Sequence, residues 1–212
     1  MSRAAVRNPG GQRTASKETR RLQLIQATIR SIAKNGLSDT TVATVAAEAK
    51  LSQGIVNLHF QSKERLLVET LRFVADEYRD AWEKALEEAG PSPAEQLEAL
   101  INVDFEPTVF APNKVAVWFA FWSETKSRPT YRKLCAERDR RYDRKLNEIV
   151  TALIRDGHYD HLDPDCVTEG LSAVGAGLWL DLLVSPRAIS RDKARQIGRT
   201  LLVQMFPDHF KP

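Results

Sequence analysis

The sequence predicts an all-α protein of about nine helices arranged in two parts. Apolar residues recur at steps of three and four along most of the chain, and the period-two alternation of a half-buried strand is absent. The ten prolines and ten glycines stand mostly at breaks between periodic segments. With 212 residues and 42% apolar content, the chain can bury the core of one large domain or of two small ones.

The N-terminal segment 1–15 is expected to be a flexible basic arm, because Arg3, Arg7 and Arg13 stand among Pro, Gly and Ser. Such an arm is either disordered, with loose attraction to phosphates, or reaches into a DNA groove. Disorder is the preferred interpretation. From Ser16 a helix with one apolar face continues to Asn35-Gly36, a pair typical of helix ends.

The stretch from residue 40 to residue 66 has the pattern of a helix-turn-helix. Two short apolar-periodic segments are separated by Lys50, Leu51 and Ser52, and Ser52 is expected to cap the second helix. In a helix-turn-helix the second helix enters the major groove of DNA. Gly54 in that helix costs about 1 kcal/mol relative to Ala, which indicates either tight packing on the first helix or close approach of a nucleic acid.

The distribution of charge agrees with DNA binding by this part of the chain. The net charge is only +3, but residues 1–66 hold eleven Lys and Arg against four Asp and Glu, a balance of +7, whereas the remainder has −4. This separation of charge is typical of a protein in which the basic N-terminal part binds nucleic-acid phosphates and the acidic C-terminal part does not. A solvated basic surface is the alternative, and the motif makes it the weaker one.

Particular side chains are predicted to contact double-stranded DNA. Gln53 and Asn57 lie one turn apart and carry amides that pair with adenine N6 and N7. Residues near helix starts, together with His59, are expected to hold phosphates. The complete predicted DNA-binding set is Thr40, Thr41, Ser52, Gln53, Gly54, Asn57, His59 and Lys63.

A long helix is predicted to begin after Ser62. Its apolar stripe runs from Leu67 to Leu86, so it spans about 25 residues, or roughly 38 Å at 1.5 Å per residue. A helix of this length connects a DNA-binding domain at 16–62 with the rest of the chain, so movement of its far end would shift the second helix of the helix-turn-helix. We expect residues 63–212 to form a ligand-binding and dimerisation domain.

Five further helices are predicted from their start and stop signals. Ser92-Pro93-Ala94-Glu95 combines an N-cap, an N1 proline and a capping-box glutamate, and Pro112, Pro129 and Pro164 stand where further helices begin. The expected spans are 93–106, 112–126, 129–156, 164–184 and 191–206.

The last two of these helices carry more apolar surface than a monomer needs. Burial inside one chain is the alternative, because terminal amphipathic helices usually cover their own stripes. A twofold dimer, however, presents two recognition helices about 34 Å apart on DNA, which favours the homodimer. The predicted interface consists of Leu171, Val174, Leu178, Leu182, Ile197, Leu201 and Met205.

Aromatic side chains predict a ligand site in the C-terminal domain. Two of the four tryptophans, Trp118 and Trp122, lie one helical turn apart, and a cage of aromatic faces holds quaternary ammonium ions by cation–π contacts. An aromatic stripe is otherwise an ordinary part of a core. The predicted ligand-binding set is Tyr78, Trp82, Trp118, Phe121, Trp122 and Trp179, with Asp104, Glu106, Glu124 or Asp181 as candidate counter-charges.

Other classes of protein receive little support. The chain lacks GxSxG, HExxH, P-loop and GxGxxG motifs, so no enzyme and no cofactor is predicted. Metal binding by the His, Asp and Cys residues between His158 and Cys166 is a minor alternative, because these residues fall on an expected turn. A helical metalloenzyme and a purely structural interaction protein stay open. No apolar run of membrane length and no secretory signal is recognised, which predicts a cytoplasmic protein with reduced cysteines.

The helix-turn-helix stretch resembles the corresponding part of a known protein family. The matches Val45-Ala46, Ala49, Leu51-Ser52, Gly54, His59-Phe60, Lys63 and Leu66-Leu67, with Thr40 and Thr41, are similar to the N-terminal signature of the TetR family of bacterial transcriptional regulators. Three further stretches resemble the choline-responsive repressors of glycine-betaine synthesis: Gly54-Ile55, residues 118–122 and residues 177–180. The chain differs from family patterns at Asn57, where many members have an aromatic residue, and at Ala176, where the choline sensors have an acidic one.

The resemblance implies a repressor that a small-molecule inducer releases from its DNA operator. The implied dimer interface is a four-helix bundle built from the last two helices of each subunit. Choline or another quaternary amine is the expected inducer, and the regulated genes are expected to serve betaine and choline metabolism. A TetR-type sensor of a hydrophobic metabolite or drug, controlling efflux, is the alternative.

Overall fold

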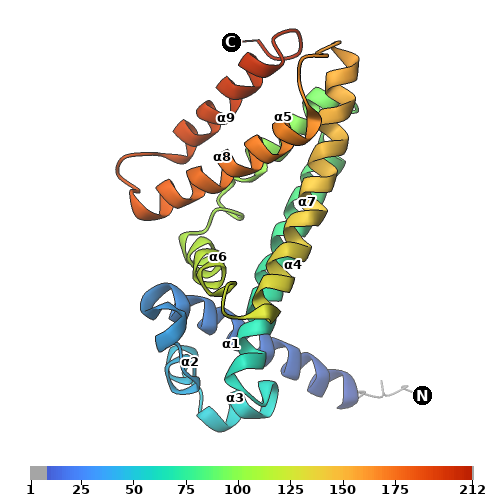
Figure 1. Cartoon of the computed structure of the whole chain (residues 1–212). Helices are drawn as coiled ribbons and strands as arrows, with labels where there is room; N and C mark the ends of the chain where they lie inside the picture. The colour runs from blue at the N-terminus through green and yellow to red at the C-terminus, as the bar shows by residue number, and fades with distance from the viewer. Residues whose placement is uncertain (1–8, 212) are drawn as a thin grey trace, which may run out of the picture. The chain divides into compact units, whose positions relative to one another are not determined.

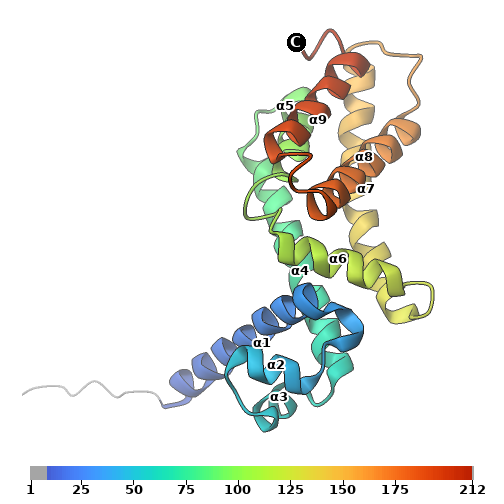
Figure 2. The same cartoon turned by 90° about the vertical axis from the view of Figure 1, so that its left-hand side faces the viewer.

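The computed structural model describes residues 9–211, except for the side chains of residues 9–16, 138 and 139, and this part of the chain is all-α (Figures 1 and 2). Its helices confirm the predicted fold class, and their starts agree with the Pro and capping signals from α5 onward. They are α1 Pro9–Asp39, α2 Val42–Ala49, α3 Gln53–Phe60, α4 Lys63–Glu88, α5 Pro93–Val103, α6 Pro112–Glu124, α7 Pro129–Asp156, α8 Pro164–Val184 and α9 Arg191–Met205.

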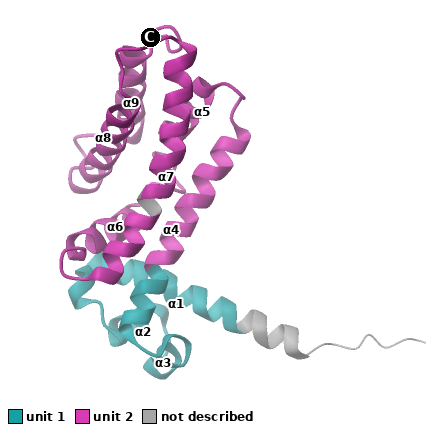
Figure 3. Cartoon of the chain, turned by 45° about the vertical axis from the view of Figure 1, so that its right-hand side comes forward, with its two compact units in different colours: residues 1–70 teal, residues 71–212 magenta. Residues whose placement is uncertain are grey.

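The chain divides into two compact units, one up to Thr70 and one from Leu71 onward (Figure 3). Helix α4 is continuous through this boundary, so its first two turns belong to the first unit and the remainder to the second. The predicted long connecting helix is therefore present.

Helix α1 is longer than expected at its N-terminal end. Its backbone is helical from Pro9, so the predicted flexible arm is wrong for residues 9–15, and residues 1–8 lie outside the described part. Once a helix is nucleated, each added residue gains one backbone hydrogen bond, which lets a stable helix extend beyond its strongest segment. Near the other end Gly36 has φ 79° and interrupts the helical run, as Asn35-Gly36 predicts.

The first unit has one apolar core shared by α1, α2, α3 and the start of α4. Helix α1 packs on α2, and α2 packs on α3. The buried side chains are Leu24, Ile25, Ala27, Ile29, Ile32, Val45, Ala46, Ala49, Val56, Phe60, Leu66 and Leu67. Burying an aliphatic or aromatic side chain contributes about 1.5 to 3 kcal/mol, so this core is sufficient to hold the short helices α2 and α3 in place.

The second unit is a helical bundle in which α7 packs against α5, α6 and α8, while α9 packs against α5 and α8. Figures 1 and 2 both show α8 and α9 side by side at the C-terminal end of this unit. The predicted capping box at α5 is present, because Ser92 Oγ accepts from Glu95 N and Glu95 Oε2 accepts from Ser92 N.

Helix α8 is the element that bears on the expectation about membrane spans. Within the described residues it is the one helix whose length and apolar composition are sufficient to cross a membrane, although 33% of the relevant window is buried in the protein. A single such helix is weak evidence, because core helices of other proteins meet the same criterion.

Candidate functional site: helix-turn-helix surface and aromatic cavity

The turn between α2 and α3 has the geometry of a helix-turn-helix. Lys50 adopts the left-handed conformation with φ 55° and ends α2, and the Leu51 amide donates to Ala46 O at 2.9 Å. Helix α3 then begins at Gln53. The predicted cap by Ser52 is wrong, because its side chain makes no capping hydrogen bond and is exposed.

Helix α3 has a buried side and an exposed side. Val56 and Phe60 are buried in the unit core, whereas Gln53 and Asn57 are exposed, one turn apart, as predicted for base-reading residues. Leu58 lies on the exposed side with 74% of its surface accessible, and it was not predicted as a site residue. No signal in the sequence indicated this exposure, because Leu58 follows Leu51 and Ile55 at steps of four and three, the spacing typical of a buried helical stripe.

The surroundings of Gly54 decide between the two explanations for this glycine. A Cβ atom at this position would have one neighbour within 4 Å, Ser52 Oγ at 3.7 Å, so nothing in the described protein fills the space beside it. Tight packing on α2 is therefore wrong as the reason for Gly54. The open backbone is consistent with the close approach of an external partner.

The two threonines before α2 differ in position. Thr41 is exposed, and its hydroxyl accepts from the Thr44 amide, so it lies at the helix start where phosphates bind. Thr40 is 1% exposed and donates to Gly36 O at 2.8 Å. The predicted phosphate contact of the Thr40 side chain is therefore wrong, because its hydroxyl is used inside the protein.

His59 and Lys63 both have contacts within the first unit. The Nδ1 atom of His59 is buried without a hydrogen-bond partner in the described structure. Desolvation, with the nearby cations Lys17, Arg20 and Arg21, lowers the pKa of His59. Lys63 is half-buried and its Nζ donates to Ser38 O at 3.2 Å, which holds the ammonium at the start of α4.

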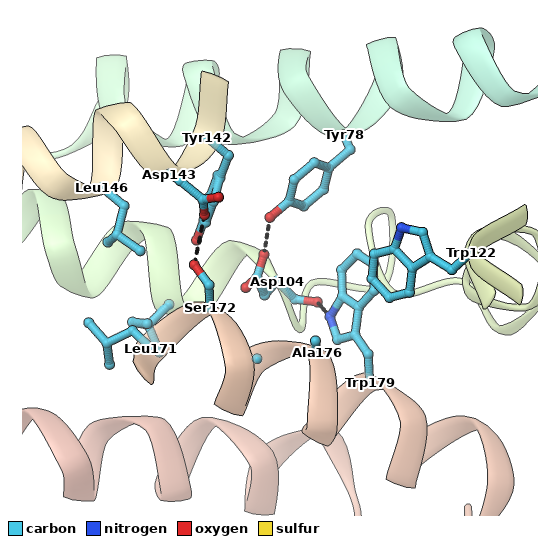
Figure 4. A pocket seen from close by; sticks show the side chains of 12 residues that line it. Tyr78, Asp104, Trp122, Tyr142, Asp143, Leu146, Leu171, Ser172, Ala176 and Trp179 are labelled. Atoms are coloured by element: carbon cyan, nitrogen blue, oxygen red, sulfur yellow. Dashed lines mark hydrogen bonds between the residues drawn. The ribbon is translucent and has the colours of Figure 1, made fainter. Parts of the chain in front are cut away.

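The second unit contains a cavity of about 220 Å³ between α4, α5, α6, α7 and α8 (Figure 4). Three aromatic residues of the predicted ligand set line it, namely Tyr78, Trp122 and Trp179. The other lining residues are Ile101, Asp104, Tyr142, Asp143, Leu146, Leu171, Ser172, Gly175 and Ala176. Tyr142 is an aromatic lining residue that was not predicted from the sequence.

Asp104 is the centre of the polar contacts in the cavity. Its carboxylate accepts a hydrogen bond from the Tyr78 hydroxyl at 2.7 Å, and its backbone oxygen accepts from Trp179 Nε1 at 3.0 Å (Figure 4). The side chain is 8% exposed. Among the four candidate counter-charges named from the sequence, Asp104 is the one that lines the cavity.

A second carboxylate faces the same cavity. Asp143 accepts a hydrogen bond from Ser172 Oγ at 2.8 Å, and both residues line the wall (Figure 4). The described lining contains no Lys, Arg or His. Two carboxylates beside the faces and edges of aromatic rings make an environment that favours a cation and disfavours an anion.

Three predicted ligand residues do not line this cavity. Phe121 is fully buried and packs edge-to-face on Tyr131 with centroids 4.7 Å apart, and Trp118 is 2% exposed. Both side chains are buried in the core of the second unit, whereas that of Trp122 is half-buried. Trp82 packs against Tyr142 from behind the wall, with ring centroids 6.0 Å apart.

The predicted dimer residues separate into two groups. Leu171, Leu178 and Leu182 are buried within their own chain, and Leu171 lines the cavity, so their side chains do not form an exposed face. Half-buried positions are Val174, Ile197, Leu201 and Met205. The outer surface of α8 instead presents Leu180 and Val184, 43% and 69% exposed, with Gly170 and Gly177.

The cluster considered for metal binding does not assemble. In the described part of the chain no group of three or more His, Cys, Asp and Glu side chains is positioned to hold a metal ion. Asp163 instead caps α8 by accepting from the Cys166 amide at 2.8 Å, and this contact lowers the pKa of the Asp163 carboxyl.

Known protein families match the chain in both of its units. Residues 24–70 match the family model of bacterial regulatory proteins of the tetR family, and residues 93–207 match the BetI-type transcriptional repressor C-terminal model. The HTH-type transcriptional regulator BetI of Burkholderia thailandensis is 37% identical over 171 residues, which covers 77% of this chain and 82% of that protein. BetI 1 of Chromohalobacter salexigens is 32% identical over 180 residues, or 84% of this chain and 86% of that protein.

Solved structures share the fold. A transcriptional regulator from Pseudomonas aeruginosa PAO1 has a TM-score of 0.79 at 24% identity, covering 91% of this chain and 93% of that one. A regulator from Saccharomonospora viridis, solved in complex with choline, has a TM-score of 0.75 at 24% identity, covering 88% and 96%. The chain belongs to the TetR family of transcriptional regulators and has the C-terminal region of a BetI-type repressor.

Proposed function

We propose that this TetR-family repressor binds a DNA operator as a homodimer and that a small quaternary amine of the choline class controls the binding. The observation that carries the ligand proposal is the aromatic cavity with the two carboxylates of Asp104 and Asp143. The activity is regulatory, and no catalytic role is assigned to any residue.

On the DNA side, the proposal assigns base reading to Gln53 and Asn57, which are exposed on one face of α3. Thr41 and Lys63 stand at the starts of α2 and α4, where free backbone N–H groups also attract phosphates. Ser52, at the exposed start of α3, belongs to the same group of phosphate contacts. Since phosphate contacts position the protein and base contacts specify the site, the two groups should differ in their response to random DNA.

On the ligand side, the trimethylammonium group of choline would lie against Trp122, Tyr142 and Trp179. Each cation–π contact contributes about 0.5 to 2 kcal/mol, and the nearby carboxylates add Coulomb attraction. The ligand hydroxyl has polar partners in the same wall. The choline-bound regulator of similar fold supports this class of ligand.

The alternative ligand is a neutral hydrophobic metabolite or drug. Burial of such a compound beside Asp104 and Asp143 would remove water from two carboxylates without supplying a positive charge to balance them, which is unfavourable by several kcal/mol. The lining therefore supports the cationic ligand over the neutral one.

The dimer is proposed to form through the outer surfaces of α8 and α9. At Gly170 and Gly177 of α8 an added Cβ atom would meet nothing within 4 Å, so another helix can approach these positions closely. Leu180 and Val184 extend this apolar surface, and Ile197 and Leu201 of α9 are half-buried in the single chain. Together they replace the buried leucines in the expected interface.

The proposed mechanism is a shift between two populations of the dimer. Helix α4 begins beside the recognition helix and carries Tyr78 into the cavity wall, so a ligand that changes the Tyr78 position also acts on α4. Choline would lower operator affinity only by as much as it prefers the conformation that fits DNA poorly.

The test begins with selection of bound fragments from genomic DNA by the purified protein, followed by titration of the recovered operator with and without choline. The expected result is a twofold-symmetric site whose affinity falls on addition of choline, with no effect of glycine betaine, since its carboxylate is repelled by the cavity. Protein that ignores every duplex at low ionic strength would refute the DNA-binding proposal. Operator affinity that choline leaves unchanged would refute the ligand proposal alone.

A further inference from the structure

Leu58 is an apolar side chain in an unexpected position on α3. It is 74% exposed, the largest exposed fraction among the large apolar side chains of the described residues. The apolar face of the helix that packs on the core is instead formed by Val56 and Phe60, which lie one turn apart and are buried. Leu58 therefore contributes nothing to the core of its own unit and is available for a contact with a partner.

The position of Leu58 on the helix places it beside the predicted base readers. Asn57 and Leu58 are adjacent on the exposed side of α3, and each has a residue one turn earlier, Gln53 for Asn57 and Gly54 for Leu58. Leu58 therefore lies on the same face as Gly54, one turn further along, and none of its side-chain atoms comes within 4 Å of the place where a Gly54 Cβ would stand.

Gly54 leaves that region empty. A Cβ atom there would have only Ser52 Oγ, at 3.7 Å, within 4 Å, so Leu58 and the bare Gly54 backbone form an open apolar surface. A flat base edge with a methyl group fits against such a surface, whereas a larger residue at position 54 would cover it.

We infer that Leu58 reads a thymine in the operator by contact with its C5-methyl group. The inference rests on the proposed function, because it requires α3 to enter the major groove. In that groove the methyl group distinguishes thymine from the other three bases, and apolar side chains are its usual partners. The polar readers Gln53 and Asn57 recognise adenine, so Leu58 adds a readout of a different chemical kind.

The experiment replaces each thymine of the selected operator, one position at a time in both half-sites, by deoxyuridine. This change removes the methyl group and keeps the base pair. Burial of one such group is equivalent to about fourfold in affinity for each half-site, so about fifteenfold for both half-sites is expected at one thymine position. The other thymines should respond weakly.

Variants of the protein assign that response to Leu58. Leu58→Ala should bind the thymine operator less tightly and should lose its sensitivity to deoxyuridine at the responsive position. Leu58→Met keeps an apolar side chain and should keep the sensitivity. Leu22→Ala is the matched control, because Leu22 is also an exposed leucine of the first unit, 43% exposed, but lies on α1. It should respond to deoxyuridine as the parent protein does.

Thermal unfolding distinguishes a loss of folding from the loss of a DNA contact. The melting temperature of Leu58→Ala should equal that of the parent, because the Leu58 side chain is exposed. An operator that is bound selectively while no thymine-to-uracil change alters affinity would overturn the inference. Equal sensitivity of Leu58→Ala and the parent would overturn it as well. Absence of any selective operator would refute the proposed function itself, and the inference with it.

Discussion

The hydroxyl of Tyr78 donates a 2.7 Å hydrogen bond to the carboxylate of Asp104, joining the middle of α4 to the end of α5. Both side chains are buried, at 5% and 8% exposure, and both line the cavity. This bond lies where the proposed ligand charge would be neutralised and also on the helix that continues to the DNA-binding unit. Charge recognition and signal transmission can therefore be tested separately at its two ends.

Asp104→Asn should abolish most of the choline affinity. The substitution keeps the shape of the side chain and removes its charge, and a cation about 5 Å away at an effective dielectric of about 20 loses roughly 3 kcal/mol of attraction. Calorimetry should show affinity lower by at least tenfold. Asp181→Asn, at an exposed position of α8 outside the cavity, is the control and should bind like the parent.

Tyr78→Phe should separate binding from response. The ring is kept, so contact of the cavity with a cation is retained, and calorimetric affinity should stay within about threefold of the parent. The link between α4 and Asp104 is lost, so choline should lower operator affinity less than it does in the parent. Full induction by choline in this variant would contradict a role for the hydrogen bond in transmission.

Trp122→Ala should mainly reduce choline affinity and Trp118→Ala should mainly reduce stability, although the two residues are one turn apart. Trp122 is half-buried and lines the cavity, so its loss should weaken choline binding by about 0.5 to 2 kcal/mol with a modest change in melting temperature. Trp118 is 2% exposed, and truncating a buried tryptophan costs about 3 to 5 kcal/mol of stability. Thermal unfolding with calorimetry distinguishes them, and equal losses of ligand affinity in well-folded variants would contradict the assignment.

The contrast between Trp118 and Trp122 shows which features of the structure can be predicted from the sequence and which cannot. The helices were predictable because their signals are local: Ser92 with Glu95, and prolines at the starts of α5 to α8. The rotation of each helix within the bundle is not a local property. The spacing of Trp118, Phe121 and Trp122 places them on one face, but packing of α6 on its neighbours determines that Trp122 alone lines the cavity.

Contacts between residues far apart in the chain also could not be predicted from the sequence. Asp104 was one of four acidic candidates, and its selection depends on Tyr78 and Trp179, which lie 26 and 75 positions away. Thr40 was predicted to face DNA from its place before α2, yet its hydroxyl donates to Gly36 O across the break in α1. No periodicity in the sequence encodes that bond.

Gly177→Arg should convert the dimer into a monomer. An added Cβ atom at Gly177 meets nothing within 4 Å in its own subunit and the position is exposed, so the single chain should fold and gain helix propensity. Across a close helix contact, an arginine would be buried without a partner. Light scattering after size exclusion should show the monomer mass, and operator affinity should fall. Leu171→Ala is the control, because Leu171 is buried at the cavity and should leave the dimer intact.

His59 should make the stability of the DNA-binding unit depend on pH. Desolvation, followed by the nearby cations Lys17, Arg20 and Arg21, lowers its pKa in the folded protein below the ordinary value of 6.5, with a smaller opposing effect of Glu18. The unfolded chain therefore binds more protons between the two pKa values, so this contribution to stability is complete above about pH 6.5 and is lost as the pH falls below it. Melting temperatures of His59→Gln should decline less steeply than those of the parent between pH 7.5 and pH 5. His161→Gln, at an exposed turn residue of the second unit, should decline as the parent does, and identical slopes for His59→Gln and the parent would contradict the linkage.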